Sequence, residues 1–366
     1  MPTTLTSIYE RTKKVIIKAS SLETDKYLDR NDYRHSGITA LNLALRTPGY
    51  RKGRIVEIFG PEHSGKTLMA HLAVIAEQKI NKKPSLFGDY EWSFDRNWFQ
   101  TLGGDLNLLD IHVPDPKEDS MESIYDVLLY QIRTGKYSFA VLDSIVGPAL
   151  IPKNIQEKFM QDNRDVALEA RINQDFLKKA YGLCIQTDTT LIVTNHIRDA
   201  VGVMFGDPET TPGGKALKFY AEQRIRIGTP QQRTKDGHKA PGKIRKNKRG
   251  ASAGWTFEFG LNYKNGVDNF GDMMKYLEMN ELIPAPIDKE KPKISAAIRK
   301  DWAVYNKYED AILNKINLKP VDMESLSSSK ITEHEDLKDY EDDIPTEITE
   351  EDKKIIENAE KEKVPQ

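Results

Sequence analysis

The chain has 366 residues, 38% of them hydrophobic, with 54 basic and 56 acidic residues for a net charge of −2, so it can bury one large core or two smaller ones. The first twenty residues mix charged with aliphatic side chains and do not resemble a secretory signal, and no apolar run approaches the roughly 18 residues that span a bilayer, so we expect no membrane segment. With a single cysteine, Cys184, the chain can form neither an internal disulfide nor a cysteine metal cluster, and we expect a soluble, cytoplasmic protein.

Apolar strands alternate with helical patterns over the first two thirds of the chain, after an amphipathic helix expected at 5–20 that is held apart from the core. We expect strands at 54–59, 84–89, 108–113, 138–143 and 189–195, and helices at 66–80, 94–102, 120–134 and roughly 164–180. Short apolar strands separated by helices indicate a mostly parallel sheet covered on both faces, so the predicted fold class is α/β. Such sheets bind ligands at the carboxyl ends of their strands.

The pattern changes beyond residue 221. Shorter strands follow, with a basic hairpin-like segment at 238–250 and a strand within 254–263. Residues 273–330 are predicted to form a small, mostly helical C-terminal domain with a Pro- and Lys-rich connector at 284–293. The last segment, 331–366, holds 14 acidic and 5 basic residues, so the rest of the chain carries 49 basic and 42 acidic residues. Such a tail is either a solvated, disordered segment or a competitor for an anionic ligand of the basic body.

A phosphate-binding motif follows the first strand of the sheet. The sequence GPEHSGKT at 60–67 fits G-x-x-x-x-G-K-[ST], and its residues are Gly60, Pro61, Glu62, His63, Ser64, Gly65, Lys66 and Thr67. Between a strand and a helix, its backbone N–H groups can cradle phosphates, with Lys66 on the β- and γ-phosphates and the Thr67 hydroxyl on Mg²⁺. The alternative is an ordinary glycine turn at a helix start.

Polar residues also follow three other strands of the predicted sheet. Asp143 can hold the magnesium shell, although an aspartate there can also cap a helix. Glu91 can orient and deprotonate an attacking water, but Asp89 lies equally near the strand end and spacing does not choose between them. His196 can sense a γ-phosphate, or it can be a structural histidine.

The loop FGDPETTPGG at 205–214, with three glycines and two prolines, is predicted to have little internal structure.

Four segments resemble the bacterial RecA recombinases and their phage-encoded relatives, over roughly residues 35–272. They are GRIVEIFGPEHSGKT, FAVLDSI, NHIRDAVGVMFGDPETTPGGKALKFYA and KNK at 246–248. The resemblance implies a RecA-like P-loop ATPase core that binds ATP and Mg²⁺ between adjacent subunits of a helical filament on single-stranded DNA, and exchanges strands with homologous double-stranded DNA. It implies that Glu91, not Asp89, is the catalytic carboxylate, that Asp95 and Trp98 contact adenine, and that Asp143 belongs to the magnesium shell.

The resemblance also assigns DNA-binding and interface residues. A first DNA loop corresponds to 147–163, with Arg171 behind it, and a second to 197–213. The DNA-binding residues it implies in and after the second loop are Arg198, Met204, Phe205, Gly213 and Gly214. Lys246 and Lys248 correspond to a pair that reaches the neighbouring subunit's ATP and takes part in catalysis, and Lys218 and Phe219 to residues that couple nucleotide state across that interface. Backbone N–H groups, Arg198 and the apolar Met204 and Phe205 suit DNA binding without base readout.

Some positions depart from the family pattern. His196 stands where bacterial RecA proteins usually have glutamine, Ala200 where lysine is common, and Asp207 and Pro212 where asparagine and threonine are common. These changes make the second loop less positive.

The expected domains are an N-terminal polymerisation segment at 1–34, the ATPase core at 35–272, the C-terminal domain at 273–330 and the acidic tail at 331–366. The leading hypothesis is a filament-forming recombinase of the cytoplasm and nucleoid, whose partners the resemblance extends to a single-strand-binding protein and a loader. A non-catalytic recombination mediator and a hexameric RecA-fold helicase are the alternatives.

Overall fold

The computed structural model describes residues 30–146, 164–199, 209–212, 215–250, 253–264, 266–283 and 287–318. The chain divides into two compact units, of which the first holds Met1–Arg198 with Thr211–Lys319 and the second holds Asp199–Thr210 with Pro320–Gln366. The short strands β8 (Arg198–Asp199) and β9 (Glu209–Thr210) form a two-stranded sheet. The N-terminal segment before residue 30 and the acidic tail lie outside the described residues, so their predicted roles stay predictions.

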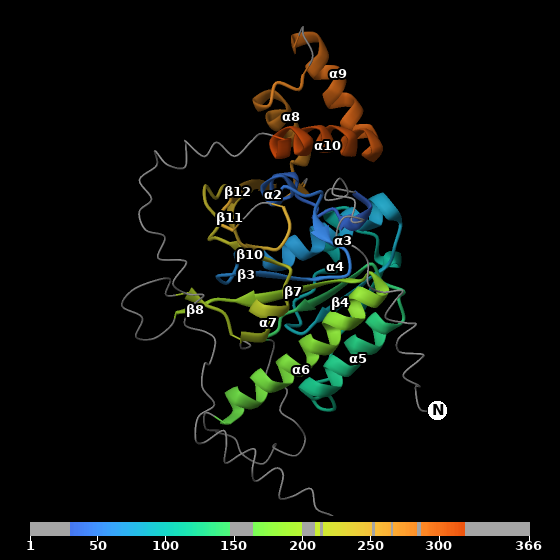
Figure 1. The fold of residues 1–366 in the computed structure, drawn as a ribbon, viewed down its shortest axis with the longest axis vertical. Coiled ribbons are helices and arrows are strands. Elements are labelled where there is room, and N and C mark those ends of the chain that lie inside the picture. The colour runs from blue at the N-terminus through green and yellow to red at the C-terminus, as the bar shows by residue number, and fades with distance from the viewer. Residues whose placement is uncertain are drawn as a thin grey trace, which may run out of the picture. The chain divides into compact units, whose positions relative to one another are not determined.

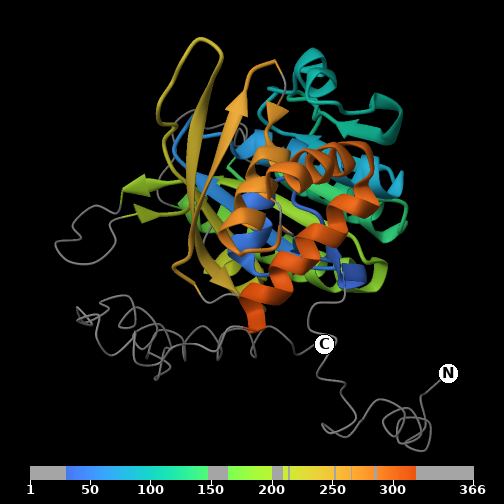
Figure 2. The ribbon, with the colours of Figure 1, turned by 90° about the horizontal axis from the view of Figure 1, so that it is seen from above.

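A nine-stranded sheet in the order β13-β12-β11-β10-β3-β7-β6-β4-β5 forms the centre of the first unit. Its strands are β3 (Ile55–Gly60), β4 (Ser85–Asp89), β5 (Leu109–His112), β6 (Phe139–Asp143), β7 (Thr190–His196), β10 (Gln223–Ile227), β11 (Gly237–Asn247), β12 (Thr256–Asn262) and β13 (Gly266–Val267). The strands from β10 to β5 are parallel, and β11, β12 and β13 are antiparallel, which confirms the predicted mostly parallel α/β sheet. In the second view β11 and β12 run side by side as long strands (Figure 2).

Helices cover both faces of this sheet (Figure 1). On one face, α2 (Thr39–Leu45), α3 (Lys66–Asn81) and α4 (Arg96–Thr101) pack in an apolar cluster that includes Val56, Ile58 and Ile192 of the strands. On the other, α5 (Met121–Arg133), α6 (Arg164–Thr187) and α7 (Lys215–Tyr220) pack against Ile55 and Val193. Consecutive strand residues thus face opposite layers, as the two-residue period of a strand requires. No helix in the described ranges is long and apolar enough to cross a bilayer.

Three C-terminal helices form a separate apolar cluster with Leu43 of α2. They are α8 (Asn269–Met279), α9 (Ile287–Lys300) and α10 (Trp302–Leu318). The predicted connector at 284–293 is wrong from residue 287 onward, because α9 begins there and contains Pro292. Burial of Ile294 and Ile298 in the cluster favours the helix, and tertiary packing of this kind commonly outweighs local propensity.

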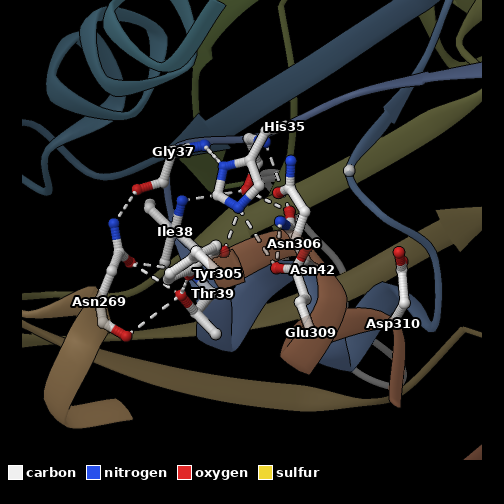
Figure 3. Close-up of polar contacts among 12 residues, drawn as sticks. His35, Gly37, Ile38, Thr39, Asn42, Asn269, Tyr305, Asn306, Glu309 and Asp310 are labelled. Carbon is white, nitrogen blue, oxygen red and sulfur yellow. Dashed lines mark hydrogen bonds and ion pairs between the residues drawn. The ribbon is translucent and has the colours of Figure 1, made fainter. Parts of the chain in front are cut away.

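A buried polar network attaches α10 to the segment before α2 (Figure 3). Glu309, which is 0% exposed, contacts His35 Nε2 at 3.2 Å, accepts from Asn42 Nδ2 at 2.9 Å and pairs with Arg30 at 2.8 Å. Tyr305 hydrogen-bonds Thr39 in the same network. Burial alone would raise the pKa of Glu309, but His35, Arg30 and Asn42 outweigh it and hold the pKa at about 2. The carboxylate is therefore a fully satisfied structural charge.

Candidate nucleotide-binding site

The loop between β3 and α3 has the conformation that its glycines allow. Gly65 caps α3 with a φ of 98°, in the left-handed region that favours glycine. At Gly60, an added Cβ would lie 2.3 Å from the backbone oxygen of Ile227, so a side chain is excluded there. Since the loop ends at the N-terminus of a helix of 16 residues, backbone N–H groups and the positive end of the helix dipole face the same point. The predicted strand-loop-helix arrangement of residues 60–67 is confirmed.

Lys66 folds back over this loop. Its Nζ donates to the backbone oxygens of Pro61 at 2.8 Å and Gly60 at 3.3 Å. Burial lowers the pKa of Lys66, and Glu91, Asp143 and Glu62 oppose that shift. The ammonium therefore sits among acceptors that a phosphate oxygen could replace.

Asp143, at the end of β6, lies beside the start of α3. Thr67 Oγ1 donates to Asp143 Oδ2 at 2.7 Å, and Thr194 of β7 donates to the other oxygen. The carboxyl is 1% exposed, and burial raises its pKa to about 6. The described ranges hold no group of three His, Cys, Asp or Glu side chains suited to a metal, so an ion here needs further oxygen ligands from phosphate or water. The hydroxyl and the buried carboxylate fit Mg²⁺, whose ligands are oxygens.

The two acidic candidates after β4 have different surroundings. Both carboxylate oxygens of Asp89 accept backbone N–H groups, from Ser93 at 2.9 Å and Phe94 at 3.0 Å, and the residue is 3% exposed. Glu91 instead is half-buried and faces the ends of β6 and β7. Asp89 is thus committed to holding the 89–94 turn, and Glu91 is the carboxylate that stands at the sheet edge.

Two side chains hold Glu91 at that edge. Its Oε1 accepts a hydrogen bond from Ser144, directly after β6, and contacts His196 Nε2 at 3.1 Å. These contacts, His196 first, lower the pKa of Glu91 despite partial burial. His196 is also the register partner of Gly60 in the neighbouring strand, so the histidine adjoins the first residue of the phosphate loop. The sheet edge therefore brings together three of the predicted residues, Glu91, His196 and Gly60.

The two residues predicted to contact adenine lie at the start of α4. Asp95 is its N-cap, and its side chain accepts the backbone N–H of Trp98 at 2.9 Å. Trp98 is half-buried against the apolar cluster of α3. Asp95 therefore has a structural function here, which leaves its predicted adenine contact a prediction.

Lys246 lies on β11, two strands away from β3, and Lys248 follows directly after the end of that strand. Lys246 Nζ donates to the backbone oxygens of Lys218 at 2.6 Å and Phe219 at 3.2 Å, at the C-terminal end of α7. Burial, Lys248 and Arg224 lower the pKa of Lys246 to about 8. Phe219 is 72% exposed, an unusual position for a phenylalanine. The four predicted interface residues thus form one group within the chain.

The structure describes only part of the predicted DNA-binding surface. Arg171 is exposed on α6, and Arg198 begins β8, although its side chain lies outside the described residues. Met204, Phe205, Gly213, Gly214 and the first loop at 147–163 also lie outside them.

Five further polar residues in the sheet or directly after one of its strands were not predicted from the sequence. They are Glu57, Ser144, Thr194, Asn195 and Arg224. Ser144 and Asn195 directly follow or precede predicted site residues, so the strand-end rule could have found them. Glu57 interrupts an apolar strand, which already signals a buried charge that needs a partner. Nothing local identifies that partner as Arg224, which is 167 residues away.

Comparisons with known proteins identify the family of this chain. The model of the RecA N-terminal domain family matches residues 5–268. The chain is 38% identical over 275 residues to Protein RecA of Bacteroides thetaiotaomicron, which covers 74% of this chain and 81% of that protein. It is 36% identical to Protein RecA of Mycoplasma mycoides and 38% identical to that of Staphylococcus aureus, each covering 68% of this chain and 70% of the relative. A solved structure of the RadB recombinase aligns with a TM-score of 0.48 and 15% identity, over 64% of this chain and 98% of its own. From the family model and the similarity to the three RecA proteins we conclude that the chain belongs to the RecA family of recombinases.

Proposed function

We propose that this protein is a DNA-dependent ATPase that assembles into helical filaments on single-stranded DNA and catalyses homologous pairing and strand exchange. The observation that carries the proposal is the position of Glu91, held by Ser144 and His196 beside the phosphate loop. A non-catalytic mediator has no use for such a placed carboxylate together with Lys66, Thr67 and Asp143. Membership of the RecA family supports the same activity.

ATP and Mg²⁺ fit the loop at 60–67 and the pair of Thr67 and Asp143. Backbone N–H groups of the loop and the Lys66 ammonium would hold the phosphates, while Thr67 and Asp143 would hold the ion and its waters. When bound there, Mg²⁺ would supply positive charge to neutralise the charge that develops on the phosphates. Asp95 and Trp98 would contact the base. Asp95 is exposed, so its side chain can meet the base while it also caps α4.

Glu91 is the residue that acts on the attacking water. Its lowered pKa keeps the side chain ionised near neutral pH, so that it can orient a water and accept its proton. His196 reports the γ-phosphate: because it already contacts Glu91 at 3.1 Å, a phosphate oxygen that binds its Nε2 competes directly with the carboxylate. Hydrolysis and sensing therefore share one hydrogen bond.

DNA binds through 147–163 and 197–213, with Arg171 and Arg198 on phosphates and Met204 and Phe205 against bases. Contacts of this kind accept any sequence and weaken as salt rises. Lys246 and Lys248 reach the ATP of the neighbouring subunit, and the exposed Phe219 packs across the same interface with Lys218. Strand pairing itself supplies sequence discrimination.

Negative-stain electron microscopy with single-stranded DNA and a non-hydrolysable ATP analogue tests the assembly. We expect extended helical filaments that require the analogue, and none with Lys66→Ala under the same conditions. Closed rings would favour a hexameric helicase, and DNA binding without any regular assembly would favour a mediator.

A further inference from the structure

A buried ion pair crosses the centre of the sheet on the face away from α3. Glu57 of β3 is 0% exposed, and its Oε2 pairs with Arg224 Nε of β10. The guanidinium also lies 4.8 Å from the centre of the Phe59 ring. A buried carboxylate is costly unless both oxygens are satisfied. The second oxygen of Glu57 accepts from Asn195 Nδ2 of β7 at 3.0 Å.

The same amide group of Asn195 reaches beyond the sheet. Nδ2 also donates to the backbone oxygen of Pro212 at 3.1 Å, in the segment that precedes α7. An amide carries two N–H protons, so one goes to Glu57 and the other to Pro212. Both partners are acceptors, which fixes the orientation of the amide, since a flipped oxygen would face two oxygens. The Asn195 Oδ1 is buried and has no hydrogen-bond partner among the described residues, so the two donations alone hold the side chain.

Asn195 and His196 are consecutive in β7 and therefore point to opposite faces. His196 shares its face with Thr194, which contacts Asp143, and reaches Glu91. Asn195 shares the other face with Val193 and reaches Glu57 and Pro212. Two consecutive side chains of β7 thus make separate connections: His196 contacts Glu91 at the candidate nucleotide site, and Asn195 contacts Pro212.

The ion pair also adjoins β11, the strand that holds Lys246. Arg224 is the register partner of both Glu57 and Lys246. A continuous set of contacts thus runs from β11 through Arg224 and Glu57 to Asn195 and Pro212.

We infer that Asn195 is a positioning residue for DNA binding, which ties the end of the second loop at Pro212 to the Glu57–Arg224 pair. The inference rests on the proposed function of 197–213 as a DNA-binding segment. If the end of this segment is already fixed to the sheet, DNA binding costs less conformational entropy, because fewer residues must be ordered when DNA binds. His196 reports the nucleotide, and Asn195 holds the segment that responds.

The test compares wild type with Asn195→Ala, Asn195→Ser and, as a matched control, Asn173→Ala. Asn173 is a buried amide on α6 that accepts from Tyr125 at 2.5 Å and contacts neither the nucleotide edge nor Pro212 among the described residues. Binding of a fluorescent oligothymidine is measured by anisotropy with a non-hydrolysable ATP analogue. Loss of a hydrogen bond to a buried charge and of the anchor should weaken DNA binding by about tenfold or more in Asn195→Ala. A serine hydroxyl has one proton for two acceptors, so the DNA affinity of Asn195→Ser should lie between those of wild type and Asn195→Ala.

Nucleotide turnover separates positioning from general damage. The KM for ATP and the DNA-independent turnover should stay at the wild-type value in Asn195→Ala, while more DNA is needed for half-maximal stimulation. The inference is overturned if DNA binding is unchanged, or if the KM for ATP rises in parallel with the loss of DNA affinity.

Hydrogen exchange tests the anchor without DNA, so it decides the matter even if wild type fails to bind oligothymidine and the proposed function is wrong. Peptides covering 209–212 should exchange faster in Asn195→Ala and Asn195→Ser than in wild type or Asn173→Ala. Equal exchange in all four proteins would show that Asn195 anchors nothing. If Asn195→Ala does not fold, the serine variant carries both measurements.

Discussion

Two glutamate-histidine pairs in this protein have nearly the same geometry and opposite surroundings. His196 Nε2 lies 3.1 Å from Glu91 Oε1, with 27% and 32% of the side chains exposed, and His35 Nε2 lies 3.2 Å from Glu309 Oε1, with 1% and 0% exposed. In the buried pair, Asn42 and Arg30 also satisfy the carboxylate. In the open pair, Ser144 and His196 both contact the same oxygen of Glu91, Oε1. The same contact is therefore structural in one place and exchangeable in the other.

Accessibility explains the difference. Removing one member of a buried pair leaves polar groups that water cannot reach, whereas a half-exposed pair exchanges its partner for water or a ligand at little cost. The C-terminal helices need the first property, since they depend on a permanent attachment. The nucleotide response proposed for the Glu91–His196 pair would need the second.

The largest effect is expected at the open pair, on activity. Glu91→Gln should lower the turnover of ATP about 10²- to 10⁴-fold, the usual contribution of a positioned general base, while DNA binding with an ATP analogue persists. The free energy of unfolding should change by less than about 1 kcal/mol, because the pair is half-exposed. Phosphate release in the presence of single-stranded DNA measures the turnover, and urea unfolding measures the free energy of unfolding. Normal turnover would exclude Glu91 as the catalytic carboxylate.

At the buried pair the effect should fall on stability. Glu309→Gln should lower the free energy of unfolding by about 3 kcal/mol, since His35 and Arg30 lose a charge-assisted partner that solvent does not replace. Urea unfolding followed by tryptophan fluorescence measures it, because Trp302 lies 5.5 Å from the His35 ring. Unchanged stability would mean that the network of Figure 3 does not hold the C-terminal helices.

A third histidine sharpens the comparison, because it is buried without any carboxylate. His71 is 2% exposed among Phe87, Phe94 and Phe99, and neither ring nitrogen has a hydrogen-bond partner among the described residues. Burial lowers its pKa to about 4, with a weaker opposing effect of Asp95. As the pH falls, His71 therefore takes up a proton in the unfolded state at a higher pH than in the folded state. The free energy of unfolding decreases as the pH falls from about 6.5 to about 4.

His71→Phe should remove this loss. Between pH ~7 and pH ~5 wild type should lose about 2 kcal/mol more than the variant, as urea unfolding at both pH values would show. Glu309 does not interfere, since its pKa of about 2 places its own loss of stability below pH ~4.5. Equal pH dependence in both proteins would contradict the assignment.

The smallest effect is expected from Asp310→Asn, which is the matched control for Glu309→Gln. Asp310 pairs with the same Arg30 at 2.6 Å, but its side chain is 42% exposed. Its loss should cost less than about 1 kcal/mol in the same urea experiment. If the two variants were equally destabilised, burial would not be what separates the two kinds of pair.

Much of this fold could be predicted because its signals are local. Apolar runs such as 138–143 and 189–195 became buried parallel strands, and the glycines and Lys66 of the phosphate loop followed the first strand. The start of α9 could not be predicted, because Pro292 and its lysines favour a connector locally. Only the packing of Ile294 and Ile298 against α8 and α10 made it a helix.

The sequence by itself determined which residues end the strands of the sheet, and hence that Lys66, Glu91, Asp143 and His196 would share one edge. The tertiary structure decided what each contacts. Asp89 and Glu91 are two residues apart, yet one holds a backbone turn and the other meets His196, 105 residues away. Likewise Asn195 meets Glu57 only because β3 and β7 are neighbours. Strand order sets such contacts, and strand order depends on long-range packing that no local pattern encodes.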